Sequence, residues 1–362
     1  MTSLLEHYRM QVNERIFQAI DSPDWLASMR SSDFYEEFSA PAKALLSYGK
    51  RTRAAFAGSG WQLFTAFSPD DDFRNSLLPI TAGAALELYQ GSALIHDDII
   101  DTALSRRGLP AAHIAFRQIH ESAKLKGKSA KFGLNSAILL GDFLLSLACH
   151  TFEKSEHISE AALTKARLIF HGMTAEVAFG QYLDNRREFM PFTANYDEEI
   201  AQSFNVIYHK SARYSVECPL KIGAALAGAT DTQIHELSKI GIALGEAFQL
   251  RDDQLGVFGD ESATGKPSGG DLIEGKRTVL IGLTRKLTSA SNRELLDSAL
   301  GKPLTGAQIS ELQNIIKQCG AYEIHEEMIQ SRENAAKEEI GKMKQSSSIL
   351  NALVQQLSSR KS

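Results

Sequence analysis

Cysteine is scarce in this chain, and its few cysteines lie far apart. Cys149, Cys218 and Cys319 are an odd number of thiols, and no two of them have CxxC spacing. Disulfide frameworks and structural zinc sites use paired or closely spaced cysteines, so this pattern argues against both. We expect three packed thiols in a reducing compartment.

The sequence also lacks the segments that direct a protein into a membrane. Residues Met1 to His7 contain no basic stretch followed by an apolar one, and the most apolar stretch, Ser136 to Cys149, contains Asp142. Signal peptides and membrane-spanning helices need such uninterrupted segments. We therefore predict a cytosolic protein without a membrane span.

No charge of one sign dominates the chain. The formal net charge is -5 and the isoelectric point is about 6.1. This balance gives no overall attraction to nucleic acid, so no nucleic-acid partner is expected. With 362 residues, of which 43% are hydrophobic, the chain can bury a large core, and we predict one domain over residues 1–362.

Alternating β-branched runs are missing from the long segments, which show a helical period instead. An apolar stripe near the N-terminus consists of Leu4, Leu5, Tyr8, Val12, Ile16 and Ile20. Ala- and Leu-rich stretches predict helices near residues 76–103, 133–153, 157–185, 194–229 and 231–259. The sequence therefore predicts an all-α bundle. Pro219 lies inside one of these stretches, where it should kink or divide the helix.

Two stretches have the composition of loops. Residues 121–133 contain four lysines and little apolar content, which favours a solvated surface loop. Residues 260–276 are rich in Gly, Ser, Asp and Lys and follow an acidic cluster directly. That position favours a functional closing loop over an idle connection.

Two aspartate clusters lie within apolar helical stretches. The first is Asp97-Asp98-x-x-Asp101 and the second is Asp252-Asp253. Carboxylates in such surroundings cost free energy unless a cation neutralises them. In a helix, Asp97 and Asp101 project from one face about one turn apart, so they can share a hard cation, most simply Mg²⁺.

Basic residues flank the first cluster on both sides. Gly49-Lys50-Arg51-Thr52-Arg53 precedes it, and Arg106-Arg107 follows it closely. A lone DDxxD is more often a solvated helix face, and isolated basic pairs are usually charges at helix ends. Acid for metal and base for phosphate together indicate a diphosphate that is held through metal ions.

Taken in order, these motifs resemble the trans-isoprenyl diphosphate synthase family, the polyprenyl synthetases. The resemblance covers roughly residues 45–285. The matching residues are Gly49-Lys50-x-x-Arg53, Gln90, Asp97-Asp98-x-x-Asp101, Arg106-Arg107-Gly108, Gly180-Gln181-x-x-Asp184, Lys210-Ser211, Gln249-x-x-Asp252-Asp253 and Thr264-Gly265-Lys266 through Lys276. The resemblance implies a helical bundle around a central cavity, the isoprenoid synthase type I fold, and a homodimer.

The resemblance also implies a Mg²⁺-dependent reaction in which isopentenyl diphosphate condenses with an allylic diphosphate. Three Mg²⁺ ions would hold the allylic diphosphate, with Asp97, Asp101 and Asp252 as direct ligands and Asp98 and Asp253 acting through water. Direct diphosphate contacts would come from Arg106, Lys210 and Lys266. Ionisation leaves a carbocation, so stabilising the departing diphosphate is most of the catalytic task.

A second diphosphate site, without metal, is implied for isopentenyl diphosphate. Lys50, Arg53 and Arg107 would bind it with Gln90, since the planar fork of arginine can donate two bonds to phosphate oxygens. The remaining substrate-binding positions are Ser211, Gln249 and Lys276. After the double bond attacks the cation, the proton is expected to leave to the released diphosphate.

Product length is expected to depend on the helix that carries the first cluster. Farnesyl-making relatives often have aromatic residues four or five positions before the first aspartate, where this chain has Ala93 and Ser92. Because these two side chains are small, the pocket for the growing chain should stay open at their depth. This predicts a product longer than fifteen carbons, with geranylgeranyl diphosphate as the first choice and a longer prenyl chain as the second, and Tyr89 would close the pocket further down. Another departure is Gly256, where many relatives have a third aspartate, and Asp260 is a possible substitute.

Other functions remain open at this point. A class I terpene cyclase shares the ionisation chemistry but needs no second diphosphate site. A non-catalytic subunit of a heteromeric synthase would be expected to lose its acidic clusters. A metal phosphohydrolase could use the His96-Asp97 dyad, but no companion histidine pattern accompanies it.

Overall fold

The computed structural model describes residues 4–21, 27–65, 79–259, 269–344 and 346–358, and its described regular structure is almost entirely helical. The all-α prediction is confirmed. Contacts divide the chain into two compact units. Unit 1 contains Met1–Ile169, Pro219–Thr230 and Gln345–Ala352, and unit 2 contains Phe170–Cys218, Asp231–Lys344 and Leu353–Ser362. The single domain over residues 1–362 stays a prediction, and the units are described one at a time.

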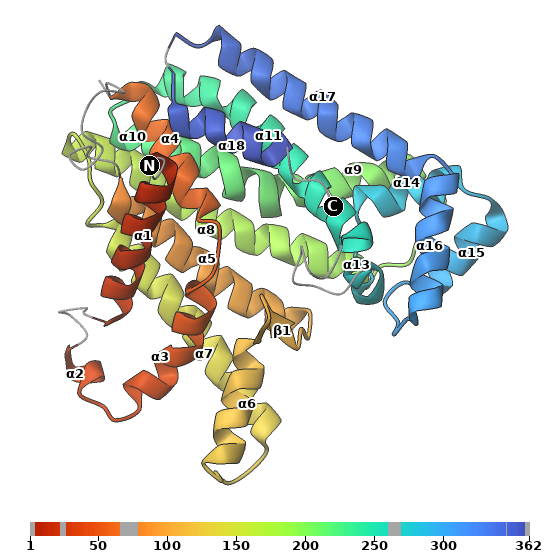
Figure 1. Cartoon of the computed structure of the whole chain (residues 1–362), viewed down its shortest axis with the longest axis horizontal. Helices are drawn as coiled ribbons and strands as arrows, with labels where there is room; N and C mark the ends of the chain where they lie inside the picture. Colours follow the sequence, from red (N-terminus) through yellow and green to blue (C-terminus); the bar gives the residue numbers. More distant parts are fainter. Residues whose placement is uncertain (1–3, 22–26, 66–78, 260–268, 345, 359–362) are drawn as a thin grey trace. The chain divides into compact units, whose positions relative to one another are not determined.

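Unit 1 consists of helices from the N-terminal half of the chain, with one short segment from its middle and one from near its C-terminus (Figure 1). Its elements are α1 (Leu4–Asp21), α2 (Ala27–Arg30), α3 (Tyr35–Leu46), α4 (Thr52–Phe64), α5 (Ile80–Ile100), β1 (Ser105–Arg106), β2 (Leu109–Pro110), α6 (Ala112–Ser122), α7 (Ser129–Phe152), the first part of α8 (Glu160–Glu188), nearly all of α10 (Cys218–Leu226) and the start of α18 (Ser348–Ser358).

The predicted apolar stripe of α1 is buried along its whole length. Tyr8 lies at its centre and is fully buried, and its hydroxyl donates to the Pro79 carbonyl oxygen over 3.0 Å. A Cβ at Gly58 would lie 2.9 Å from the Tyr8 ring, and one at Gly83 would lie 2.7 Å from its hydroxyl. The two glycines therefore make room for Tyr8 between α4 and α5.

Helices α4 and α10 cross with their backbones in contact. A Cβ at Gly60 would lie 1.9 Å from the Leu220 carbonyl oxygen, and a Cβ at Gly223 would lie 1.8 Å from that of Ala57. No side chain fits at either position without a shift of the backbone. This crossing fixes α4, which has Arg53 in its first turn.

Helix α7 packs against α5 and α6 within unit 1. Among the described residues it is the one helix long and apolar enough, by length and composition, to cross a membrane, and it is partly buried as a core helix. His96 of α5 approaches it closely, because its Nε2 lies 3.3 Å from the Ile138 carbonyl oxygen. Gly141 makes room for that ring, since a Cβ there would lie 2.3 Å from Nε2. His96 thus contributes to helix packing.

Unit 2 is also helical and has its own apolar core. Its elements are the remainder of α8, α9 (Tyr196–Val206), η2 (Ile207–Glu217), α11 (Asp231–Phe258), α13 (Gly270–Glu274), α14 (Val279–Leu287), α15 (Ala290–Ala299), α16 (Gly306–Gln318), α17 (Ala321–Lys342) and the end of α18. Leu250, Leu280 and Ile316 are among the fully buried core residues. Helix α17 packs along α11 (Figure 1).

Pro219 divides its helical stretch, as predicted, through an unexpected π-helix. The stretch runs as α9, the π-helix η2 and then α10, which begins at Cys218. The N–H of Cys218 bonds to the Arg213 carbonyl oxygen, five residues back. Proline has no N–H and its ring crowds the carbonyl four residues earlier, so the wider π-helical turn accommodates it.

Both predicted loops are shorter than expected, because parts of them are helical. Residues 129–133 form the first turns of α7, where a Cβ at Gly133 would lie 2.2 Å from the His113 carbonyl oxygen of α6. Close packing of α6 on α7 therefore outweighs the lysine-rich composition. In the second stretch, Gly270–Glu274 forms α13, and residues 260–268 lie outside the described part.

A β-hairpin was also missed. Ser105 pairs with Pro110 and Arg106 pairs with Leu109 in an antiparallel ladder. Its turn has Arg107 at φ 56° and Gly108 at φ 76°, the left-handed pair that a two-residue hairpin favours.

Candidate functional site

The first acidic cluster lies at the C-terminal end of α5, which ends at Ile100 with Asp101 as its cap. Arg106 holds the cluster together. Its Nε donates to Asp98 Oδ1 over 2.7 Å, and its Nη2 donates to that same oxygen and to Asp97 Oδ2, the latter over 3.3 Å. Burial raises the pKa of Asp98, and the Arg106 guanidinium opposes that rise.

The hairpin turn separates the two adjacent arginines. Arg106 bonds to the acidic cluster, whereas Arg107 Nη1 donates to the carbonyl oxygens of Leu45 and Tyr48, the first over 3.2 Å. Neighbouring residues on a short strand and its turn thus contact two chemically different places. The positive φ of Arg107 makes this divergence possible.

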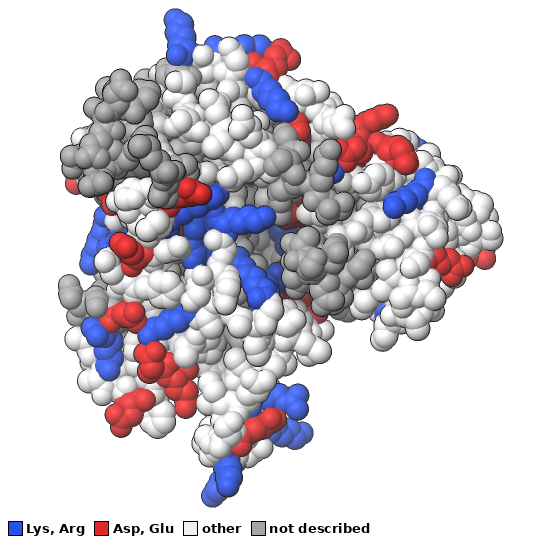
Figure 2. Space-filling view, in the orientation of Figure 1, with Lys and Arg blue, Asp and Glu red and all other residues white. Residues whose placement is uncertain are grey.

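Arg107 belongs to a basic group that surrounds the connection between α3 and α4. A Cβ at Gly49 would lie 3.0 Å from a guanidinium nitrogen of Arg107 and equally close to one of Arg51. Arg53 is near enough to lower the pKa of Arg107 further, although burial is the main cause of that decrease. Lys50, which precedes Arg51 in the sequence, is exposed. The space-filling view shows Lys and Arg side chains gathered over the N-terminal helices (Figure 2).

Helix α11 carries the second acidic cluster in unit 2. Asp253 is buried and accepts a hydrogen bond of 2.8 Å from Gln249 Nε2, one turn earlier. Burial and then the neighbouring carboxylate of Asp271 raise the pKa of Asp253 well above its usual range. Asp252 is half-buried beside it.

Asp271 occupies the space that Gly256 leaves open. A Cβ at Gly256 would lie 2.1 to 2.5 Å from the carboxylate atoms of Asp271. The carboxylate beside the second cluster therefore comes from α13, further along the chain. Asp260, the substitute suggested by the sequence, lies outside the described residues.

Lysines and acids from three segments of unit 2 meet at Asp184 on α8. Lys210 Nζ lies 2.6 Å from Asp184 Oδ2, and Lys276 Nζ lies 3.8 Å from the same oxygen. Lys276 also bonds to Glu188 over 3.0 Å. A Cβ at Gly180 would lie 2.5 Å from the Lys210 backbone nitrogen, so η2 and α8 touch at this level. Asp184 thus collects two of the predicted phosphate-binding lysines.

The remaining predicted site residues that the structure describes lie on α5 and η2, and they differ in burial. Gln90 and Ser211 are half-buried on α5 and η2. Of the chain-length positions, Tyr89 and Ser92 are buried and Ala93 is half-buried. Lys266, with Thr264 and Gly265, lies outside the described part of the chain.

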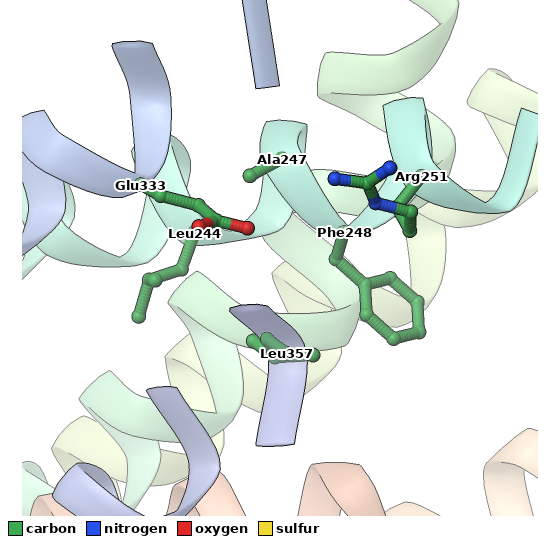
Figure 3. A pocket seen from close by; sticks show the side chains of 6 residues that line it. All are labelled: Leu244, Ala247, Phe248, Arg251, Glu333 and Leu357. Atoms are coloured by element: carbon green, nitrogen blue, oxygen red, sulfur yellow. The ribbon is translucent and has the colours of Figure 1, made fainter. Parts of the chain in front are cut away.

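A pocket in unit 2 is separate from these residues. It is lined by Leu244, Ala247, Phe248, Arg251, Glu333 and Leu357. The side chains converge on it from α11, α17 and α18 (Figure 3). Arg251 is held by Glu326, with contacts of 2.6 and 2.8 Å. None of the predicted site residues lines this pocket.

The carboxylates of the two acidic clusters are oxygen ligands of the kind that bind hard divalent cations. Oxygen ligands are what Mg²⁺ prefers, and the raised pKa values of Asp98 and Asp253 show that burial disfavours their charged forms. A bound cation would reverse that penalty. Within either unit, no three acidic, His or Cys side chains of the described residues form a ready-made cation site.

The sequence matches the polyprenyl synthetase family model over residues 35–319. The chain belongs to the polyprenyl synthetase family. It is 33% identical over 238 residues to geranylgeranyl diphosphate synthase of Sulfolobus acidocaldarius, a match that covers 65% of this chain and 66% of that protein. A short chain isoprenyl diphosphate synthase of Methanothermobacter thermautotrophicus is 34% identical, with 60% of both chains covered. The chain therefore spans just under two thirds of these curated relatives.

A solved structure of a geranylgeranyl pyrophosphate synthase covers nearly all of the chain. A geranylgeranyl pyrophosphate synthase of Corynebacterium glutamicum, complexed with isoprenyl diphosphate and magnesium, has a TM-score of 0.88 and 31% sequence identity. That match covers 99% of both chains. The predicted polyprenyl synthetase membership and helical fold are thus confirmed.

Sequence reasoning missed one residue of unit 1, Glu87, and two of unit 2, Glu188 and Asp271, that contact or act electrostatically on predicted site residues of their own unit. Asp271 lies in the stretch with loop composition, and its acidic character five residues before Lys276 was the available signal. Glu188 follows Asp184 by one helical turn, the spacing that puts two acids on one face. Glu87 precedes Gln90 by nearly one turn on α5, but only the fold shows that its carboxylate meets the basic group.

Proposed function

We propose that this chain is a Mg²⁺-dependent prenyltransferase that condenses isopentenyl diphosphate with an allylic diphosphate to give an all-trans prenyl diphosphate. The observation that carries the proposal is the divergence of Arg106 and Arg107. Arg106 lies on the carboxylates at the end of α5, and Arg107 lies in the basic group at the start of α4. Unit 1 thus offers a metal-binding acidic group and a separate anion site, as a reaction between two diphosphates requires.

Each acidic residue has a proposed role in holding Mg²⁺. Asp97, Asp101 and Asp252 would be direct ligands, and Asp98 and Asp253 would act through water. Three ions are proposed, and when bound they supply positive charge against the departing diphosphate. Relevant support is the magnesium in the complex of the Corynebacterium glutamicum synthase.

The chain's own cations would complete the charge around the allylic diphosphate. Arg106 and Lys210 are proposed to exchange part of their contacts with Asp98 and Asp184 for phosphate oxygens, together with Lys276 and Lys266. These ion pairs hold the basic groups in place beforehand, which lowers the cost of reorganisation during cleavage.

Isopentenyl diphosphate would bind without metal to Lys50, Arg53 and Arg107, with Gln90 beside them. Its double bond attacks the allylic carbocation, a new carbon–carbon bond forms, and a proton leaves the adduct to the released diphosphate. Ser211 and Gln249 are proposed to line the same reaction space. No side chain needs to act as a nucleophile in this scheme.

We propose a product of twenty carbons or more. The support is the size of the side chains before Asp97, because Ser92 is small and only 2% exposed. Tyr89, nearly one turn deeper and 6% exposed, is the proposed floor. Relatives of similar identity include geranylgeranyl, geranylfarnesyl and nonaprenyl diphosphate synthases, so identity alone does not choose among these lengths.

A homodimer is also proposed. Helix α7 exposes an apolar strip of Leu134, Ile138 and Leu139 beside Asn135 and Asp142, and Leu139 is 60% exposed. A second copy of the chain would cover this apolar strip.

Labelled isopentenyl diphosphate tests the function. The purified chain is incubated with it and with geranyl, farnesyl or geranylgeranyl diphosphate, with Mg²⁺ or with EDTA. Primer-dependent and Mg²⁺-dependent incorporation into longer prenyl diphosphates is expected. Conversion of the primer to a hydrocarbon without incorporation would indicate a cyclase, and no conversion under saturating Mg²⁺ would reject the proposal.

A further inference from the structure

Glu87 of α5 is a buried carboxylate among arginines. It is 4% exposed, and Arg51 beside it is 3% exposed. Its Oε2 lies 3.8 Å from Arg51 Nη1. Burying a carboxylate at such a position costs free energy unless neighbouring cations pair with it.

The same carboxylate caps helix α4. Its Oε1 accepts a hydrogen bond of 3.2 Å from the backbone N–H of Ala54, one of the amides that a helix N-terminus leaves without an internal partner. The N-cap residue, Arg51, has a left-handed backbone and makes no side-chain cap of its own. Glu87 therefore fixes the first turn of α4, and Arg53 lies in that turn.

Arg51 ties this turn to the rest of the basic group. Its Nε donates to Asn13 Oδ1 over 2.5 Å, and its Nη1 donates to the Tyr48 carbonyl oxygen over 3.2 Å. Arg107 also donates to the Tyr48 oxygen. Two guanidinium groups thus share one carbonyl, and their like charges repel each other unless an anion is close.

Glu87 is the anion that acts on several of these arginines. Burial lowers the pKa of Arg9, Arg51 and Arg107, and Glu87 opposes the decrease in each case. The carboxylate therefore offsets the repulsion between the guanidinium groups and lets them lie close together before any phosphate arrives.

We propose that Glu87 is a positioning residue of the metal-free diphosphate site, where it holds the first turn of α4 and the Arg51–Arg107 pair in the geometry that receives a diphosphate. The inference rests on the proposed function for the identity of the ligand. It makes Arg51 an indirect contributor, since Arg51 acts through Tyr48 and Asn13.

A simple electrostatic view gives the opposite expectation. Removing a negative charge from a phosphate site should strengthen anion binding through Coulomb attraction. If Glu87 positions the arginines, its neutralisation should weaken binding instead, because the like-charged guanidinium groups separate without it. The sign of the change therefore distinguishes the two views.

The test substitutes Glu87→Gln, whose amide oxygen can still accept from Ala54 while the charge is lost. Calorimetry with inorganic diphosphate in EDTA measures the site without metal. We expect affinity to fall roughly tenfold or more. In the full reaction, the KM for isopentenyl diphosphate should rise by a similar factor, while the KM for the allylic primer and kcat stay near their wild-type values.

Glu156→Gln is the matched control. Glu156 caps α5 in the same unit, since its carboxylate oxygens accept from the Thr81 N–H over 2.9 and 3.1 Å. The thermal stability of Glu156→Gln should change by about as much as that of Glu87→Gln. Its diphosphate affinity should equal that of the wild type. If Glu87→Gln does not fold, Arg51→Lys replaces it, because lysine keeps the charge but cannot reproduce the fork of bonds. Affinity should then fall as well.

Equal or tighter diphosphate binding by folded Glu87→Gln or Arg51→Lys overturns the inference. So does an equal loss of affinity in Glu156→Gln, which would indicate general loosening of unit 1. Failure of the proposed function looks different: the wild-type chain would bind diphosphate without metal, Glu87→Gln would bind it more weakly, and neither would elongate a primer. A wild-type chain that binds no diphosphate in EDTA rejects both.

Discussion

Gly256 and Asp271 illustrate how one residue without a side chain makes room for the carboxylate of another. The sequence showed glycine at the position of the third aspartate but not the carboxylate that lies there, because that carboxylate comes from a residue fifteen positions further along. Asp97, Asp101 and Asp252 could be singled out from spacing. Arg51 and Glu87 could not, since their roles depend on a left-handed turn and on the contact between α4 and α5.

Asp271→Asn tests the replacement. The carboxylate next to Asp253 is expected to support Mg²⁺ binding, so its neutralisation should raise the Mg²⁺ concentration for half-maximal activity by about tenfold. Steady-state assays over a Mg²⁺ series measure this. Asp197→Asn, at an exposed acid paired with Lys286, should leave the Mg²⁺ requirement unchanged, and an unchanged requirement in Asp271→Asn would refute the assignment.

Ser92→Phe tests the open level before the first cluster. A ring in place of this buried hydroxymethyl group should shorten the main product by one or more five-carbon units. Chromatography of the dephosphorylated products measures the change, and Ser92→Ala should leave the length as in the wild type. Identical product lengths for Phe and Ser would reject the open-pocket account.

Hydrophobic periodicity predicted the long helices well. It did not predict the irregular elements, which are a π-helix and a β-hairpin. The stripe of α1 and the helices over α5, α8 and α11 follow from apolar spacing. The π-helix η2 and the hairpin β1–β2 do not, because Pro219 and the turn at Arg107 impose them within a folded environment. Both irregular elements carry or adjoin residues of the candidate site, Lys210 and Arg106 among them.

Gly60→Ala tests the backbone contact that fixes α4. A methyl group 1.9 Å from the Leu220 oxygen would force the helices apart, with a cost of about 1–3 kcal/mol in the free energy of unfolding. Denaturant unfolding measures the cost. Gly172→Ala on α8 has nothing within 4 Å of the new methyl group and should stabilise by about 0.5–1 kcal/mol. Equal effects of the two substitutions would contradict the crossing.

For the whole molecule, the account expects two copies of the chain joined through α7. The apolar composition of that helix was visible in the sequence, but which of its faces lies outward follows only from its packing on α5 and α6. The period of the apolar residues predicted a helical protein. It could not predict the division into two compact units.

Leu139→Glu tests the assembly. A charge at Leu139, the most exposed residue of the strip, should convert a dimer into a monomer at micromolar concentration, because burying an unpaired carboxylate costs more than such a strip contributes. Size-exclusion chromatography with light scattering measures the mass. Met10→Glu, at a 54% exposed position of α1, should leave the mass as in the wild type, and a monomeric wild-type chain would contradict the dimer.

The proposed function requires this protein to hold two diphosphates by different means, one through metal ions and one through arginine and lysine. Calorimetric titration of isopentenyl diphosphate and of an unreactive farnesyl diphosphate analogue, each with Mg²⁺ and with EDTA, tests it most directly. The account predicts that isopentenyl diphosphate binds in both conditions and that the farnesyl analogue binds only with Mg²⁺. An equal Mg²⁺ requirement for both ligands, or none for either, would contradict it.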